Sequence, residues 1–225
     1  MMDHIKSGIE ALQKQDLEGA AKHFNAAIEE NPNDPVGYVN FGNLLMRMND
    51  LEKAERFFRR AIELDEKAAT AYYGLGSMYY TGEKYDKATQ QLMEALKLGL
   101  DEGDVHYLLG MSLLQTEQEK LALPYLQRAA ELEDRDAAIV FQYGLALANA
   151  GEVDTAQQVL LGLLEWSPDH SDALYNVGVA YLYQQKLETA LAYMEKALKA
   201  QPDHEMAMHG KAQIELIMEQ IENEE

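Results

Sequence analysis

The 225-residue sequence contains no cysteine, a single tryptophan and only five prolines. Without cysteine the chain forms no disulfide, has no thiol nucleophile and holds no cysteine-ligated zinc. No stretch approaches the roughly 18 uninterrupted apolar residues that a membrane-spanning helix needs. The amino-terminal residues also lack the apolar core of a signal peptide. We therefore expect a soluble, cytoplasmic protein.

Positive charge is scarce as well. The 19 lysines and arginines are outnumbered by 39 aspartates and glutamates, which gives a formal net charge of −20. Phosphate backbones and anionic lipid headgroups are bound through Lys and Arg, so such a surface repels both. We therefore expect neither nucleic acid nor a membrane as partner. Hydrophobic residues, at 47%, are nevertheless abundant enough for a packed core.

Motifs for catalysis and cofactor binding are missing too. The sequence has no glycine-rich nucleotide loop, no nucleophile elbow, and no histidine pair at the i, i+4 spacing of a helical metal site. Its many acidic pairs are typical of solvated helix surfaces. We expect no catalytic residue, no metal and no cofactor. An enzyme built on this scaffold is an alternative that a bound metal or nucleotide would support.

What the sequence does contain is a strict 34-residue period. Glycine recurs at one phase, at Gly8, Gly42, Gly76, Gly110, Gly144 and Gly178. Alanine recurs at a second phase, at Ala20, Ala54, Ala88, Ala122, Ala156 and Ala190. A large apolar residue follows it by four, at Phe24, Phe58, Leu92, Leu126, Leu160 and Met194. Six units without insertion thus cover residues 1–204, which is typical of a solenoid.

Each unit carries two amphipathic stripes. In the second unit, Tyr38, Phe41 and Leu45 follow the i, i+3, i+7 spacing of one helix face. Leu51 opens a second stripe after a turn at Asn49. A glycine inside a helix costs roughly 1 kcal/mol relative to alanine, so glycines at one phase predict that two helix backbones approach closely there. Each unit is predicted to be a helix–turn–helix.

This pattern resembles the tetratricopeptide repeat family, whose 34-residue units carry a small residue, then an alanine, a large apolar residue and a late proline. The resemblance implies an all-α fold, a right-handed α–α superhelix (solenoid) of six helix–turn–helix repeats with a C-terminal capping helix. The repeats are expected at 1–34, 35–68, 69–102, 103–136, 137–170 and 171–204. A capping helix and acidic tail at 205–225 complete one continuous domain.

Two residues that do not follow the period, and the capping helix, also bear on this fold. Pro124 is expected in about the first turn of its helix, where proline is tolerated; if the helix begins earlier, the proline is expected to kink it. Gly162 is expected to weaken the second helix of the fifth repeat. In the capping helix, Ala207 and Ile214 are predicted to face the array, while Lys211 and Glu215 face solvent.

In this family the first helices of the repeats line a concave groove that usually holds the ligand. By resemblance, the groove of this chain is lined by apolar, aromatic and polar side chains. They are Asn40, Asn43, Arg47, Tyr73, Tyr80, Tyr107, Met111, Leu114, Phe141, Tyr175, Asn176, Leu182 and Tyr183. Exposed apolar surface usually marks a binding site, and asparagine can pair with a peptide backbone. We therefore expect a non-catalytic scaffold or adaptor that binds a peptide or helix of a partner protein through apolar anchors.

Two alternatives to this groove are open. The tyrosines can serve ordinary packing between helices. The chain can also be a self-assembling, homo-oligomeric module, in which the helix at 205–220 of one chain docks in the groove of another through Met206, Met208, Leu216, Ile217 and Ile221. By contrast, the Lys and Arg pattern with which some repeats grip the C-terminal carboxylates of chaperones is missing.

Overall fold

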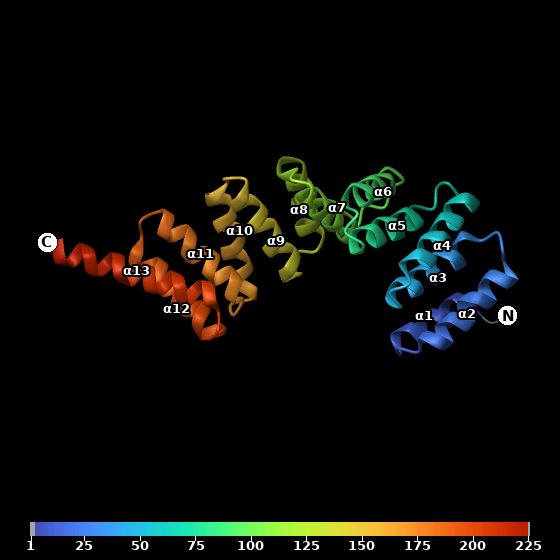
Figure 1. The fold of residues 1–225 in the computed structure, drawn as a ribbon, viewed down its shortest axis with the longest axis horizontal. Helices are drawn as coiled ribbons and strands as arrows, with labels where there is room; N and C mark the ends of the chain where they lie inside the picture. Colours follow the sequence, from blue (N-terminus) through green and yellow to red (C-terminus); the bar gives the residue numbers. More distant parts are fainter. Residues whose placement is uncertain (1–2, 225) are drawn as a thin grey trace. The chain divides into compact units, whose positions relative to one another are not determined.

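The computed structural model describes residues 3–224, apart from the side chains of residues 222 and 224. Over this range the secondary structure consists of thirteen α-helices and contains no strand (Figure 1). Their bounds are α1 His4–Gln13, α2 Leu17–Glu30, α3 Pro35–Arg47, α4 Leu51–Leu64, α5 Ala69–Thr81, α6 Tyr85–Lys97, α7 Gly103–Gln115, α8 Glu119–Leu132, α9 Ala137–Asn149, α10 Val153–Trp166, α11 Ser171–Tyr183, α12 Leu187–Ala200 and α13 Glu205–Glu224. The predicted all-helical repeat fold is confirmed.

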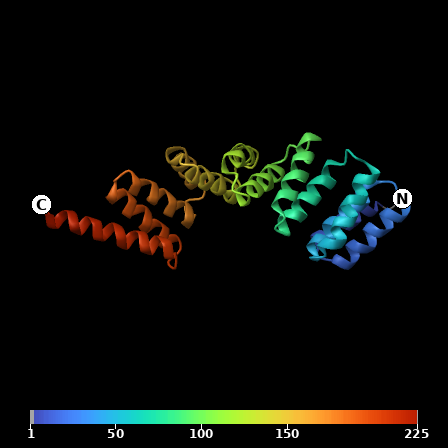
Figure 2. The same cartoon turned by 45° about the horizontal axis from the view of Figure 1, so that its top comes forward.

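The chain divides into two compact units, Met1–Tyr125 and Leu126–Glu225, here called unit 1 and unit 2. Within unit 1, helices that follow one another pack together from α1 to α7, and α3 also contacts α1 and α5. Within unit 2 the same holds from α9 to α13, and α11 also contacts α13. Figure 2 shows the antiparallel pairing of helices inside each unit. No helix among residues 3–224 combines the length and apolar character needed to cross a membrane.

Side-chain caps define many of the helix starts. Five aspartates each accept a hydrogen bond from a backbone N–H of the helix that they precede: Asp3, Asp16, Asp34, Asp50 and Asp136. Such a carboxylate satisfies an otherwise unpaired donor and complements the helix dipole. Two histidines do the same in unit 2. The Nδ1 atoms of His170 and His204 accept from the backbone N–H of Ala173 and Ala207, each at 3.2 Å.

The core of each repeat is built on the large apolar residue of its second helix. Phe24 and Phe58 are fully buried. A Cβ atom added to Gly8 would lie 2.3 Å from the ring of Phe24, and one added to Gly42 would lie 2.7 Å from the ring of Phe58. The interpretation of these glycines as sites of close backbone approach is therefore wrong at both positions. The missing side chain makes room for an aromatic ring.

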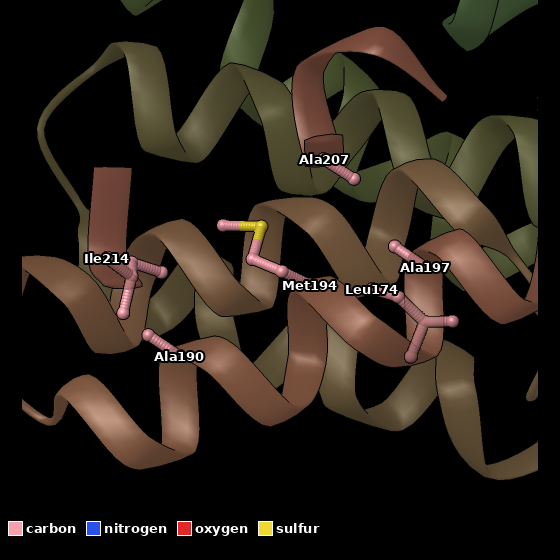
Figure 3. Packing of buried hydrophobic residues seen from close by; sticks show 6 residues of the cluster. All are labelled: Leu174, Ala190, Met194, Ala197, Ala207 and Ile214. Atoms are coloured by element: carbon pink, nitrogen blue, oxygen red, sulfur yellow. The ribbon is translucent and has the colours of Figure 1, made fainter. Parts of the chain in front are cut away.

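The terminal helix α13 belongs to the core of unit 2. Figure 3 shows Ala207 and Ile214 in a buried cluster with residues of α11 and α12, among them Met194. Lys211 lies on the outer part of α13, where its Nζ atom is 2.9 Å from Glu195 Oε1 of α12. The sequence-based assignment of the buried positions on α13 is thus confirmed.

One backbone feature recurs with the sequence period. The turn between the two helices of a repeat contains a residue with positive φ, at Gln15, Asn49, Glu83, Glu117, Gly151 and Gln185. The φ values of the five that are not glycine lie between 57° and 61°. This left-handed conformation is costly for residues with a Cβ atom, and only Gly151 avoids that cost. The turn geometry therefore repeats even though the residue type does not.

Helix α8 departs from the prediction. It begins at Glu119, so Pro124 lies inside the helix and not in its first turn. The backbone N–H of Ala122 already donates to the carbonyl of Gln118, at 3.1 Å, before the proline is reached. Because proline has no N–H, the carbonyl of Lys120 lacks its usual helical partner. The earlier start follows the other repeats, in which the second helix begins at this same phase.

Candidate functional site

The candidate residues of unit 1 come from three first helices. Asn43 and Arg47 of α3 are exposed. The others are half-buried: Asn40 of α3, Tyr73 and Tyr80 of α5, and Tyr107, Met111 and Leu114 of α7. The side chain of Asn40 donates to the carbonyl of Val36 at 2.9 Å, within its own helix. These side chains keep part of their surface accessible, and none is completely sealed in the core.

The tyrosines of α5 are neutral hydrogen-bonding groups with apolar bodies. Burial is the main reason that the pKa values of the Tyr73 and Tyr80 phenols lie above the ordinary tyrosine value, and nearby Asp104 adds to the effect at Tyr73. The ring of Tyr80 also packs edge-on against Tyr85 of α6, with centroids 5.7 Å apart. Tyr80 therefore combines packing with a partly accessible surface.

The candidate residues of unit 2 lie on α9 and α11. Phe141 contacts the ring of His170 with centroids 4.8 Å apart, and Tyr175 contacts the ring of His204 at 5.4 Å. Phe141 therefore packs against the histidine that caps α11, and Tyr175 packs against the histidine that caps α13. Leu182 and Asn176 are half-buried, whereas Tyr183 is 79% exposed. Packing between helices thus accounts for part of the role of Phe141 and Tyr175, but not for Tyr183.

A pocket of about 400 Å³ lies between α9, α10 and α11 in unit 2. It is lined by Ala148, Asn149, Val153, Ala156, Gln157, Leu160, Asn176, Val179, Ala180 and Tyr183. Asn176 and Tyr183 are the candidate residues that it brings together. The other eight lining residues were not among the candidates. Four of them belong to a second helix, and Ala148 and Ala180 carry no recognisable chemistry.

Small residues open this pocket. Ala148 occupies a phase at which the other repeats carry large side chains, namely Leu12, Met46, Tyr80, Leu114 and Leu182. Ala180 also has a short side chain, at a phase that holds Leu44 and Met78 in the second and third repeats but Ser112 and Ala146 in the fourth and fifth. The contrast with the other repeats is therefore carried by Ala148. The shorter side chains leave space where longer ones would fill the contact between helices. A missing side-chain volume within a periodic column was therefore the signal for the pocket in the sequence.

A chain of three polar side chains ends at the pocket. The Nζ atom of Lys186 donates to Gln184 Oε1 at 3.0 Å, and Gln184 Nε2 donates to Gln157 Oε1 at 2.7 Å. Gln157 is 8% exposed, and its Nε2 atom is buried without a hydrogen-bond acceptor among the described residues. Across the pocket lining, Asn176 Nδ2 donates to the carbonyl of Asp172 at 2.8 Å, within α11.

The arrangement offers hydrogen bonding and apolar contact. Over residues 3–224, no group of three or more His, Asp or Glu side chains is placed to hold a metal ion. The pocket lining itself contains amides, a phenol and aliphatic side chains, with no ionisable carboxylate or cation. Such a surface can recognise a neutral group through directed hydrogen bonds.

Comparisons with known proteins agree with this architecture. One sequence profile of the tetratricopeptide repeat matches residues 34–101. A second tetratricopeptide repeat profile matches residues 79–138, 107–165 and 141–205. A comparison of the sequence with curated proteins gives no match.

Three solved structures illustrate the likeness. YrrB, described as a tetratricopeptide repeat protein with an unusual peptide-binding site, is 48% identical, with a TM-score of 0.80 over 86% of this chain and 100% of that one. PilF of Pseudomonas aeruginosa is 19% identical, with a TM-score of 0.79 over 93% of this chain and 96% of that one. MamA of Desulfovibrio magneticus RS-1 is 20% identical, with a TM-score of 0.67 over 74% of this chain and 94% of that one. The last two share the fold alone, whereas the profiles and the first structure establish that this chain belongs to the tetratricopeptide repeat family.

Proposed function

We propose that this protein is a non-catalytic scaffold that holds a segment of a partner protein against the first helices of its repeats. Proteins of this family generally mediate protein–protein interactions. The observation that carries the proposal is the pocket between α9, α10 and α11, whose lining combines aliphatic side chains with amides and the exposed Tyr183. The peptide-binding site of YrrB, which is 48% identical, supports it further.

The physical basis is the burial of accessible apolar surface. A partner side chain that covers Val179 or the ring of Tyr183 removes apolar area from water. One such side chain contributes about 1.5–3 kcal/mol before the costs of association are subtracted. Because the net charge of the chain is −20, its field favours partner segments that are basic or neutral over acidic ones.

Site-specific photocrosslinking tests this proposal. A photoreactive phenylalanine analogue replaces Tyr183 in one variant and Met93 in a second. Met93 lies on α6 of unit 1 and is 51% exposed, so it serves as an exposed control position away from the pocket. We expect the analogue at position 183, and not the one at position 93, to crosslink a defined segment of a cellular protein.

A charge change at the pocket makes the test more specific. Val179→Glu is expected to abolish the crosslink from position 183, because it places a carboxylate among aliphatic side chains. Ala192→Glu, at an exposed position of α12, adds the same charge away from the pocket and is expected to leave the crosslink unchanged. Circular dichroism confirms that both variants fold. The same crosslinked proteins from positions 183 and 93, or an undiminished crosslink in Val179→Glu, would refute the proposal.

Self-assembly through α13 is a second candidate function. Several apolar residues of this helix are exposed, including Met206 at 58%, Ile217 at 38% and Ile221 at 47%. At 100° per residue these three lie along one side of the helix, which favours a contact with another chain. Light scattering over a range of concentrations distinguishes the two candidates. A monomer at every concentration excludes self-assembly, whereas a dimer that Ile217→Glu dissociates supports it.

A further inference from the structure

We propose that the pocket between α9, α10 and α11 recognises an uncharged peptide group of the bound segment. In this arrangement Gln157 Nε2 donates to the carbonyl oxygen of that group, and Asn176 Oδ1 accepts from its N–H. The inference rests on the proposed function, since it requires that a protein segment binds here. It names the chemical group that the pocket selects.

The orientation of the three polar side chains is fixed from the solvent end. The ammonium group of Lys186 can only donate, so Gln184 must turn its Oε1 atom toward it. The Nε2 atom of Gln184 then faces Gln157 and, as an amide nitrogen, donates there. Gln157 must therefore present its Oε1 atom to Gln184 and keep Nε2 for a different partner. Each bond polarises the next, which strengthens the last donor.

The free donor lies where water has little access. Gln157 is 8% exposed, and its Nε2 atom finds no acceptor among the described residues. A buried donor without an acceptor is unfavourable. Because water does not reach this nitrogen in the unbound structure, binding requires the Gln157 side chain to shift toward the pocket, where a ligand oxygen removes this cost. Among the described residues, no side chain that lines the pocket is a cation or a carboxylate. With a net charge of −20 for the whole chain, this lining favours a neutral acceptor over a carboxylate or phosphate.

The second half of the recognition comes from Asn176. Its Nδ2 atom is already bonded to the carbonyl of Asp172, so its Oδ1 atom is the group that can serve a ligand, as an acceptor. A donor and an acceptor on one pocket match the carbonyl and the N–H of an amide. The remaining lining, including Val153, Leu160 and Val179, suits an aliphatic side chain next to that amide. The volume of about 400 Å³ falls in the range of pockets that hold small ligands.

The test uses N-acetyl-leucine methylamide, which carries two peptide groups and one aliphatic side chain, and nuclear magnetic resonance of the full chain. We expect saturable shifts of the side-chain amide signals of Gln157 and Asn176, with a dissociation constant on the order of millimolar. The Gln157 signal is assigned by its disappearance in Gln157→Leu. That variant is expected to fold, since Leu123 and Leu191 stand at the same phase.

Two variants of equal charge isolate the donor. Gln157→Glu keeps the shape and the acceptor for Gln184 but removes the donor to the ligand, and we expect affinity to fall about tenfold or more. Gln158→Glu adds the same charge at the next, exposed residue of α10 and is expected to bind like the wild type. Lys186→Gln removes the cation that orients the amides, so a smaller loss of affinity, of about threefold, is expected.

The outcomes are distinguishable. Equal binding by Gln157→Glu and Gln158→Glu would overturn the proposal, and so would tighter binding of N-acetyl-leucine with a free carboxylate than of its methylamide. If the probe fails to bind while the crosslink from Tyr183 persists, the peptide-group assignment is wrong and the scaffold function stands. If both are lost, the scaffold function is wrong as well.

Discussion

The turn at Gly151 allows a backbone effect on stability to be measured without interference from packing. Gly151 has a φ of 86°, and a Cβ atom added there would meet nothing within 4 Å. The change Gly151→Ala therefore adds only conformational strain, roughly 1–2 kcal/mol for a left-handed residue. Reduced freedom of the unfolded chain offsets about 0.4–1 kcal/mol of it. We expect a net destabilisation of about 1 kcal/mol.

A second glycine nearby serves as the control of opposite sign. Gly162 lies inside α10 and a Cβ atom there would also meet nothing within 4 Å. Alanine favours a helix interior over glycine by about 1 kcal/mol, so Gly162→Ala is expected to stabilise the protein. The two substitutions delete and add the same atoms. Their effects are expected to differ by about 2 kcal/mol because only the backbone conformation differs between the sites.

Thermal unfolding followed by circular dichroism measures this difference. Both glycines lie in unit 2, Leu126–Glu225. For a cooperative unit of about 100 residues, 1 kcal/mol shifts Tm by about 4–8 °C, so the two variants are expected to differ by about 8–16 °C. Urea unfolding of both variants checks that the change lies in stability and not in the surface exposed on unfolding. If Gly151→Ala raises Tm, or leaves it unchanged while Gly162→Ala raises it, the assignment of strain to this turn is refuted.

Three further predictions concern single interactions. Tyr79 donates to Glu55 Oε1 at 2.7 Å and accepts from Arg59 at 2.9 Å, and its hydrogen bond is the main cause of the lowered pKa of the Glu55 carboxyl. Tyr79→Phe is expected to cost about 1–2 kcal/mol at neutral pH. A carboxyl whose pKa is lower in the folded than in the unfolded state stabilises the fold above its unfolded pKa and loses this contribution as pH falls through its folded pKa. The gap in unfolding free energy between wild type and variant should therefore shrink in acid; a constant gap would contradict this. His204→Ala is expected to lower the free energy of unfolding by about 1 kcal/mol and to speed hydrogen exchange of the backbone amides at the start of α13. His204→Asn keeps an N-cap acceptor and is expected to preserve most of the protection from exchange. Equal exchange rates in the two variants would count against the cap. Gly74→Ala places a Cβ atom 2.3 Å from the ring of Phe58 and is expected to lower the free energy of unfolding by about 1–3 kcal/mol, measured by urea unfolding. An unchanged free energy of unfolding would contradict this steric conflict.

The fold could be predicted because its determinants repeat. A residue buried in one unit, such as Phe58, has a counterpart at the same phase in every other unit, so one helix–turn–helix interpretation applies to the whole chain. The cause of the glycine phase was predicted only in part, because periodicity reveals that space is needed but not which neighbour needs it. Backbone atoms lie 3.3 Å from an added Cβ at Gly76 and Gly178, whereas aromatic rings fill the space at Gly8 and Gly42. Pro124 was misplaced for a related reason. Proline suggests a helix start, but the repeat had already set that start at Glu119.

The site was only partly predictable. Tyr183 and Asn176, which line the pocket, were among the sequence candidates because family resemblance points to the first helices. Gln157 was missed because a lone glutamine on a second helix is usually solvated, and its pairing with Gln184 joins residues that are 27 apart. The pocket itself depends on the space that the short side chain of Ala148 leaves, at a phase where the other repeats carry large side chains. Sequence motifs consist of side chains that are present, whereas this pocket forms where one repeat has a shorter side chain than the others.

The proline in α8 has a consequence for how the chain comes apart. Pro124 lies one residue before the end of unit 1, in a helix that runs from unit 1 into unit 2. The carbonyl of Lys120 lacks its usual amide partner there, so this turn of α8 has one backbone hydrogen bond fewer and unfolds more easily than the turns around it. Repeat arrays lose order through neighbouring elements in succession. Melting can therefore stop at this turn, so that residues 3–125 and residues 126–224 lose their structure in separate steps.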